Sequence, residues 1–189
     1  MSTTTVSDTA IEVCEGRFID LLNPSTADIY IGDIARSLSR ECRYSGFCTQ
    51  FYSVAQHCLL VRDILFEDGA SEEEQRAGLW HDAAEAFLGD VSAPLKRAMR
   101  TVCSVRSPYD VLEQRMQEAI RLKFRIAWNW QIASNVREAD QLALRIERAQ
   151  LMASQGRDWN GSGVPLLDWP KLKPLAPVDA YAAWLQAAR

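Results

Sequence analysis

The chain contains two histidines, His57 and His81, and each lies in a stretch with helical hydrophobic spacing. Asp82 follows His81 directly, and Asp140 is spaced with apolar residues so that it faces the interior of a third predicted helix. Buried carboxylates are unfavourable unless they are paired or bind a metal. A divalent cation held by two imidazoles and two carboxylates removes that cost. We therefore predict one divalent ion (Co, Mn, Mg, Zn, Ni or Fe) bound by His57, His81, Asp82 and Asp140.

Three further charged residues follow the His-Asp pair. Glu85 is four residues after His81, so the two share a helix face, and Glu85 is expected to reach a water on the metal rather than the metal itself. Asp90 follows the predicted helix end, and Lys96 follows the turn VSAP. Such a group favours phosphate-ester hydrolysis, because a metal lowers the pKa of water and cations offset the phosphoryl charge.

Each of these residues also has a simpler interpretation. An inward histidine can be a hydrogen-bonded core residue, and Asp140 can form a salt bridge with an arginine. Glu85 can be an exposed helix-favouring residue, and Lys96 an ordinary surface lysine. The combination is more informative than its members, because four candidate ligands fall on three predicted helices.

The positioning elements are predicted to be helices. Capping boxes at Ser53 and Ser71 open two of them, and Gly89 closes the second. Ser107 with the following proline begins a long helix, and Asn135 begins another. Short helices are expected over 28–41 and 179–189. We predict an all-α, single-domain helical bundle over 13–189, with a flexible N-terminus at 1–12 and a long Pro/Gly/Trp-rich loop at 155–177.

Composition narrows the functional class. The chain has 189 residues, 48% of them hydrophobic, which is typical of one soluble domain. A net charge of −4 and a pI near 5.3 disfavour nucleic-acid binding. The apolar stretches are too short to span a bilayer and no leader pattern is present, so we expect a cytoplasmic protein without a membrane partner. Five cysteines without a C-x-x-C pair indicate reduced thiols rather than a zinc knuckle.

Three motifs carry a family resemblance over roughly residues 17–155. RYSGFCTQFYSVAQH, HDAAEAFLGDVSAPLK and EADQLAL, in this order and spacing, resemble the HD-domain superfamily of metal-dependent phosphohydrolases. Within it they are similar to the small 5′-deoxynucleotidase group and its phage and prophage relatives. The resemblance implies an HD-type bundle that binds one divalent ion through the four ligands above. It also implies that Glu85 and Asp90 handle the attacking water and the leaving oxygen, with Arg43 as the phosphate clamp.

The RYSG loop is the expected substrate contact. Arg43 opens it, and a guanidinium fork fits phosphate oxygens bidentately. Tyr44 is a candidate for packing on a sugar or base, and Lys96 for steadying charge. The alternatives are a surface arginine and a core aromatic. Phe47 stands where related sequences commonly have a histidine, and the absence of further histidines favours a mononuclear site over a dinuclear phosphodiesterase.

We expect an enzyme, a 5′-nucleotidase-like hydrolase of nucleotide metabolism that cleaves the 5′-phosphate ester of (deoxy)nucleotides. The alternative activity is a dNTP triphosphohydrolase that releases nucleoside and triphosphate. Two other classes remain open: a nucleotide- or partner-binding protein in which a metal is only structural, and a helical interaction protein without metal. The expected partner is a small-molecule nucleotide, and a homo-oligomer is possible.

Overall fold

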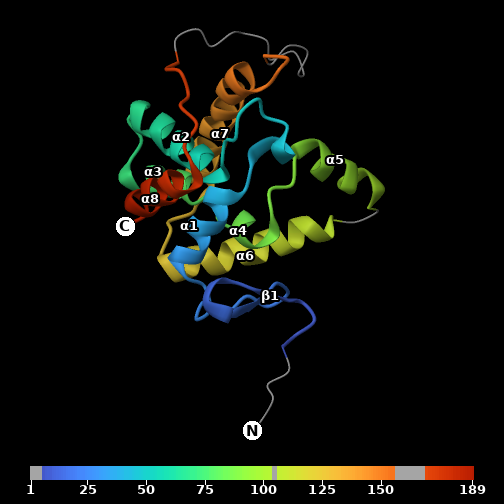
Figure 1. Cartoon of the computed structure of the whole chain (residues 1–189). Coiled ribbons are helices and arrows are strands. Elements are labelled where there is room, and N and C mark those ends of the chain that lie inside the picture. Colours follow the sequence, from blue (N-terminus) through green and yellow to red (C-terminus); the bar gives the residue numbers. More distant parts are fainter. Residues whose placement is uncertain (1–5, 104–105, 156–168) are drawn as a thin grey trace.

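The computed structural model describes residues 6–103, 106–155 and 169–189. Over these ranges the chain is mainly helical, which confirms the all-α prediction (Figure 1). Two short 3-10 helices, η1 (Cys14–Gly16) and η2 (Arg43–Gly46), and two short strands accompany the α-helices. The α-helices are α1 (Ile31–Arg40), α2 (Val54–Glu67), α3 (Glu72–Leu79), α4 (Glu85–Leu88), α5 (Ala93–Val102), α6 (Pro108–Phe124), α7 (Trp130–Leu151) and α8 (Pro177–Ala187).

Helix α2 forms the centre of the core. It packs against α1, α3, α7 and α8. Its apolar stripe, including Val54, Val61 and Leu65, is buried, and the buried stripe of α7 includes Val136 and Ala143. The hydrophobic spacing in the sequence predicted both apolar stripes. Their burial brings the central parts of α2 and α7 together.

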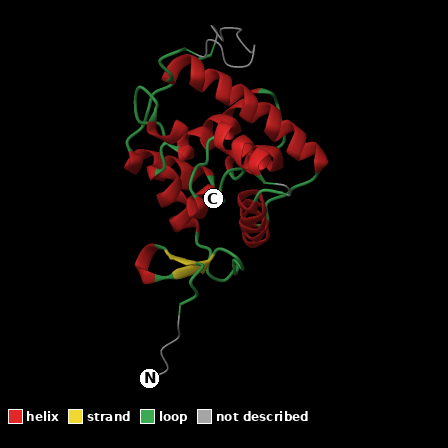
Figure 2. Cartoon of the chain, turned by 90° about the vertical axis from the view of Figure 1, so that its right-hand side faces the viewer, coloured by secondary structure: helices red, strands yellow, loops and turns green. Residues whose placement is uncertain are grey.

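A small β-hairpin lies on the N-terminal side of the helices (Figure 2). Strand β1 (Ala10–Glu12) pairs antiparallel with β2 (Phe18–Asp20), with Ile11 opposite Ile19. Strand β1 uses the end of the segment 1–12, which was predicted to be a flexible N-terminus. An ion pair of 2.8 Å between Arg17 Nη2 and Asp33 Oδ2 joins the hairpin to α1.

The predicted helix across 72–89 is interrupted. Helix α3 ends at Leu79, residues 80–84 form a turn, and α4 begins at Glu85. Gln117 of α6 explains the break, because its side chain donates to the Trp80 carbonyl at 2.7 Å and accepts from the Ala84 amide at 3.0 Å. These bonds replace helical ones. His81 therefore lies in a turn, and the expectation that it shares a helix face with Glu85 is wrong.

Several other helix boundaries differ from expectation. The Ser71 capping box is complete. At Ser53 the side chain accepts from the Gln56 amide, but the Gln56 side chain does not bond back to the Ser53 backbone. It hydrogen-bonds instead to the Lys173 carbonyl and the Leu175 amide. Helix α7 begins at Trp130 with Asn129 as its N-cap, so the predicted start at Asn135 is wrong. Helix α5, which carries Lys96, was not predicted.

The C-terminal segment is described only in part. Of the predicted loop 155–177, residues 156–168 lie outside the described residues, and 169–176 contain neither helix nor strand. The final helix was predicted and is present as α8. In the described part of the chain, no helix combines the length and apolarity needed to cross a membrane.

Candidate metal centre and adjoining pocket

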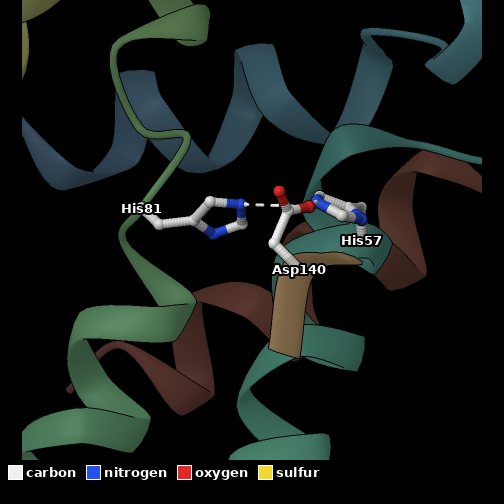
Figure 3. Close-up of side chains that lie close together, drawn as sticks. All are labelled: His57, His81 and Asp140. Atoms are coloured by element: carbon white, nitrogen blue, oxygen red, sulfur yellow. Dashed lines mark ion pairs between the residues drawn. The ribbon is translucent and has the colours of Figure 1, made fainter. Parts of the chain in front are cut away.

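Three of the predicted ligands meet at one point. His57 comes from α2, His81 from the turn after α3, and Asp140 from α7; Figure 3 shows the Asp140 carboxylate between the two imidazoles. One potential ligand atom from each residue lies within 4.8 Å of the others. This geometry can hold a metal ion, as the sequence predicted for these residues.

The hydrogen bonds of the two rings leave both Nε2 atoms available. His57 Nδ1 lies 2.7 Å from Glu147 Oε1, and His81 Nδ1 lies 2.7 Å from the Gly78 carbonyl oxygen. Because both partners accept hydrogen bonds, each Nδ1 carries the proton. Both Nε2 atoms are buried, have no hydrogen-bond partner among the described residues and lie beside carboxylates. In metal-binding histidines the nitrogen that does not bind the metal is commonly held by a hydrogen bond, so these residues fit a divalent cation.

Asp82, the fourth predicted ligand, lies against both rings. Its Oδ2 atom is 3.1 Å from His81 Nε2 and 3.5 Å from His57 Nε2. Asp140 Oδ1 is 3.1 Å from His57 Nε2. Two carboxylates therefore flank the two Nε2 atoms, and a cation among these atoms would offset both negative charges. Whether Asp82 ligates stays a prediction.

Electrostatics favour the protonated imidazoles and the ionised carboxylates while no cation is bound. Burial and the Arg43 charge lower the pKa of His57, but Glu147 and Asp140 raise it further, to about 10. Burial raises the pKa of Asp82, yet His81, His57 and Arg43 together hold it below its usual range. A divalent cation would compete with the imidazole protons for the same nitrogens.

Glu147 is a buried member of the site that the sequence reasoning missed. It lies on α7, fully buried, and its Oε2 accepts hydrogen bonds from Arg43 Nη2 at 3.2 Å and from the Tyr44 hydroxyl at 3.1 Å. Its other oxygen contacts His57. Glu147 is seven residues after Asp140, two helical turns along the same face, and this spacing was the available signal.

A pocket of about 720 Å³ adjoins the candidate ligands. All five predicted catalytic and substrate-binding residues line it: Arg43, Tyr44, Glu85, Asp90 and Lys96. Asp82 and Asp140 reach the same pocket, so the structure brings the predicted site together. Apolar side chains, including Phe47, Leu144 and Met152, line another part of it.

The charged groups of this pocket are tightly paired. Arg43 Nη1 lies 3.8 Å from Asp90 Oδ2, and Lys96 Nζ lies 3.7 Å from Glu85 Oε1 and 2.6 Å from Glu113 Oε1. Burial first, and then the Asp82 and Asp90 charges, raise the pKa of Glu85 well above its usual value. Burial also raises the pKa of Asp90, while Arg43 lowers it. Two carboxyls with raised pKa values next to the candidate ligands can take up and release protons.

Comparison with known proteins identifies relatives along most of the chain. No protein-family model matches it. YfdR of Escherichia coli K12, described as an uncharacterized protein, is 35% identical over 160 residues, which cover 84% of this chain and 82% of YfdR. A protein of Rhodobacter capsulatus, also described as uncharacterized, is 35% identical over 142 residues, 72% of this chain and 69% of that protein. The chain therefore belongs to the protein family of YfdR.

Proposed function

We propose that the protein is a metal-dependent phosphohydrolase of HD type that cleaves the 5′-phosphate ester of (deoxy)nucleotides. The observation that carries the proposal is the pair of buried, unpartnered Nε2 atoms of His57 and His81 beside Asp82 and Asp140, next to a pocket. A structural metal would need only these ligands. The two carboxyls with raised pKa values, Glu85 and Asp90, favour catalysis over a purely structural role.

The pocket has the size and lining expected for a nucleotide. Its volume of about 720 Å³ lies within the usual range for small-molecule sites. Arg43 and Lys96 supply cationic donors for phosphate oxygens, and Tyr44 and Phe47 offer aromatic faces for a sugar or base. Phe47 is 80% exposed, so its ring is available to a ligand.

The protein groups divide the proton transfers between them. A bound divalent ion would supply Lewis-acid activation of the phosphate and the attacking water. Glu85, 4% exposed and next to Asp82, has a pKa raised by burial and by the Asp82 charge. A bound cation would offset the Asp82 charge and lower this pKa, which would allow Glu85 to accept the proton of that water. Burial raises the pKa of Asp90, although Arg43 opposes this, and Asp90 would donate a proton to the leaving 5′ oxygen. Arg43 and Lys96 offset the phosphoryl charge.

The test is product analysis. The protein is incubated with Mn²⁺ or Co²⁺ and a panel of ribo- and deoxynucleoside mono- and triphosphates, and the products are separated by chromatography. We expect nucleoside and orthophosphate from monophosphates, lost in Asp82→Ala and retained in Asp63→Ala, an exposed aspartate of α2. Nucleoside and intact triphosphate from a dNTP would instead indicate a triphosphohydrolase. No metal-dependent product from any substrate would overturn the proposal.

A further inference from the structure

A second pocket, of about 640 Å³, adjoins the same site. The two pockets share Asp82, Glu85 and Lys96, and the second also reaches His81. Helix α5 contributes to both pockets. Beyond it and the shared residues they diverge, because η2 and α7 line the first pocket, whereas α6 and Trp128 line the second. The candidate metal centre therefore lies where two pockets meet.

The two pockets differ in chemistry. Tyr44, Phe47, Leu144 and Met152 give the first an apolar part suited to a nucleoside. Among its described lining residues, the second is almost entirely polar or charged, and Trp128 is its one large hydrophobic side chain. Its lining holds four cations, Lys96, Arg100, Arg106 and Arg121, together with five carboxylates, and it lacks the apolar floor that a base or sugar would need.

Arg121 differs from the other cations of the second pocket. Each of the others donates to a protein acceptor: Lys96 to Glu113, Arg100 to Asp110, and Arg106 to Gln114. In the described part of the chain, Arg121 has no carboxylate within 4.0 Å. Arg106 also has no carboxylate within this distance, but it donates to Gln114 and to the Asp110 carbonyl. Arg121 is therefore the cation of this group for which the described residues supply no acceptor.

The guanidinium of Arg121 is already oriented. Its Cζ atom lies 3.6 Å from the ring centroid of Trp128, and its Nε atom is buried with no hydrogen-bond partner in the part of the chain that the structure describes. Burial lowers the pKa of Arg121 to about 10, which records the unfavourable environment of an unpaired cation. The Nε atom is enclosed, so an anion would bind the other nitrogens of the guanidinium and offset its charge there.

We propose that this second pocket binds the inorganic phosphate species released at the metal centre, with Arg121 as its principal contact. This inference rests on the proposed phosphohydrolase function. The nucleoside is held in the first pocket, so the inorganic product leaves by the second. Orthophosphate is released from a monophosphate and triphosphate from a dNTP. Both are anions whose oxygens accept hydrogen bonds from a guanidinium, and binding assays with each anion distinguish the two sources.

The test is equilibrium dialysis of the full chain with radiolabelled orthophosphate after chelator treatment, so that binding depends on neither metal nor turnover. Unlabelled tripolyphosphate serves as the competitor in a second arm. We expect saturable binding that Arg121→Gln weakens by about tenfold or more, because a charge-assisted donor is lost. Arg121→Lys keeps the positive charge, so its affinity for orthophosphate should lie between those of the unmodified protein and Arg121→Gln. Arg137→Gln removes an exposed arginine of α7 that lines neither pocket and should leave binding unchanged.

The two arms separate the sources of the anion. If tripolyphosphate displaces labelled orthophosphate only when it is more concentrated than orthophosphate, the pocket prefers orthophosphate. If it displaces the label at much lower concentrations, the pocket prefers triphosphate. Absence of saturable binding, or binding that ignores Arg121→Gln while circular dichroism shows a folded variant, overturns the inference.

Nucleotide turnover is measured separately. In active protein, Arg121→Gln should weaken inhibition by added orthophosphate by about tenfold while KM for the nucleotide changes little. If Arg121→Gln turns over nucleotide and is inhibited by phosphate as strongly as the unmodified protein, the proposed phosphate pocket is wrong, whereas the proposed function stands. Arg121-dependent phosphate binding in a protein that hydrolyses no nucleotide would support the pocket and overturn the proposed function.

Discussion

Glu147 Oε1 lies 2.7 Å from His57 Nδ1, and this contact joins the candidate metal centre to the cationic side of the pocket. The other oxygen of the same carboxylate holds Arg43 and Tyr44. One buried side chain of α7 thus sets the tautomer of a candidate ligand and the position of the candidate phosphate clamp.

Replacing Glu147 by Gln should therefore affect both functions of the site. We expect metal affinity to fall by about 10–100-fold, as is usual when the partner of a metal-binding histidine is removed. The unfolding free energy should fall by about 1.5–3 kcal/mol, because hydrogen bonds to the charged Arg43 and His57 are weakened. Calorimetric titration with Mn²⁺ and urea denaturation measure the two effects. Glu138→Gln, at an exposed position of the same helix, is the control, and an equal effect there would contradict the assignment.

His81→Gln tests the metal centre itself. His81 is in a turn and only partly buried, so the variant should fold. A metal at about 100 times its Kd should raise the Tm of the unmodified protein by about 5–10 °C, since ligand binding stabilises the folded state. The variant should lose this shift, whereas Asp63→Asn on the surface of α2 should keep it. Thermal melts with and without Mn²⁺ measure the rise in Tm. An equally large rise in His81→Gln would exclude this residue as a ligand.

The metal-free protein should lose stability as the pH rises. The pKa of His57 in the fold is raised from 6.5 to about 10, so the folded state binds a proton that the unfolded state has released. The stabilisation is complete below about pH 6.5 and is lost as the pH rises toward 10. Metal-bound protein has neutral imidazoles and should not show this loss. Urea titrations from about pH 6.5 to about pH 9.5 compare chelated with metal-saturated protein across this window; parallel curves would argue against the shift.

Glu85→Gln should separate chemistry from metal binding. The amide cannot accept the proton of the attacking water, so kcat should fall by about 10²–10⁴-fold. Metal content and fold should be retained, because Glu85 is not one of the four predicted ligands. Single-turnover kinetics with elemental analysis make the measurement. Glu67→Gln, at the exposed end of α2 and away from both pockets, serves as control, and full activity in Glu85→Gln would assign the base elsewhere.

Gly78 tests how the turn at His81 is positioned. A Cβ atom there would overlap the Leu65 side chain and lie 3.3 Å from Val61 Cγ1, both in α2. Gly78→Ala should therefore destabilise the protein by about 1–3 kcal/mol and weaken metal binding, because the Gly78 carbonyl accepts from His81 Nδ1. Gly32→Ala in α1 meets nothing within 4 Å and should be neutral or stabilising by up to about 1 kcal/mol. Urea denaturation of both variants measures the difference.

Local chemistry in the sequence was sufficient for several features. Ser71 with Glu74 predicted a helix start that the structure contains, and the apolar spacing around Val54 and Val136 predicted the buried stripes of α2 and α7. The same spacing placed His57 and Asp140 toward the interior. Local rules suffice here because capping and amphipathic burial depend on residues within one or two helical turns.

Contacts between distant segments decided the rest. Gln117 of α6 ends the helix before His81, and Gln56 binds the C-terminal segment instead of completing its capping box. Gln117 is far along the chain from the turn at 80–84, and the C-terminal segment is far from Gln56. Hydrophobic periodicity reports only on nearby residues, so it could not predict these contacts. The sequence by itself determined which residues are able to bind a metal and which helix faces are buried. Only the tertiary structure decided that Glu147 orients His57 and that the Arg121 Nε atom is buried without a partner, because both depend on which side chains meet after the helices have packed.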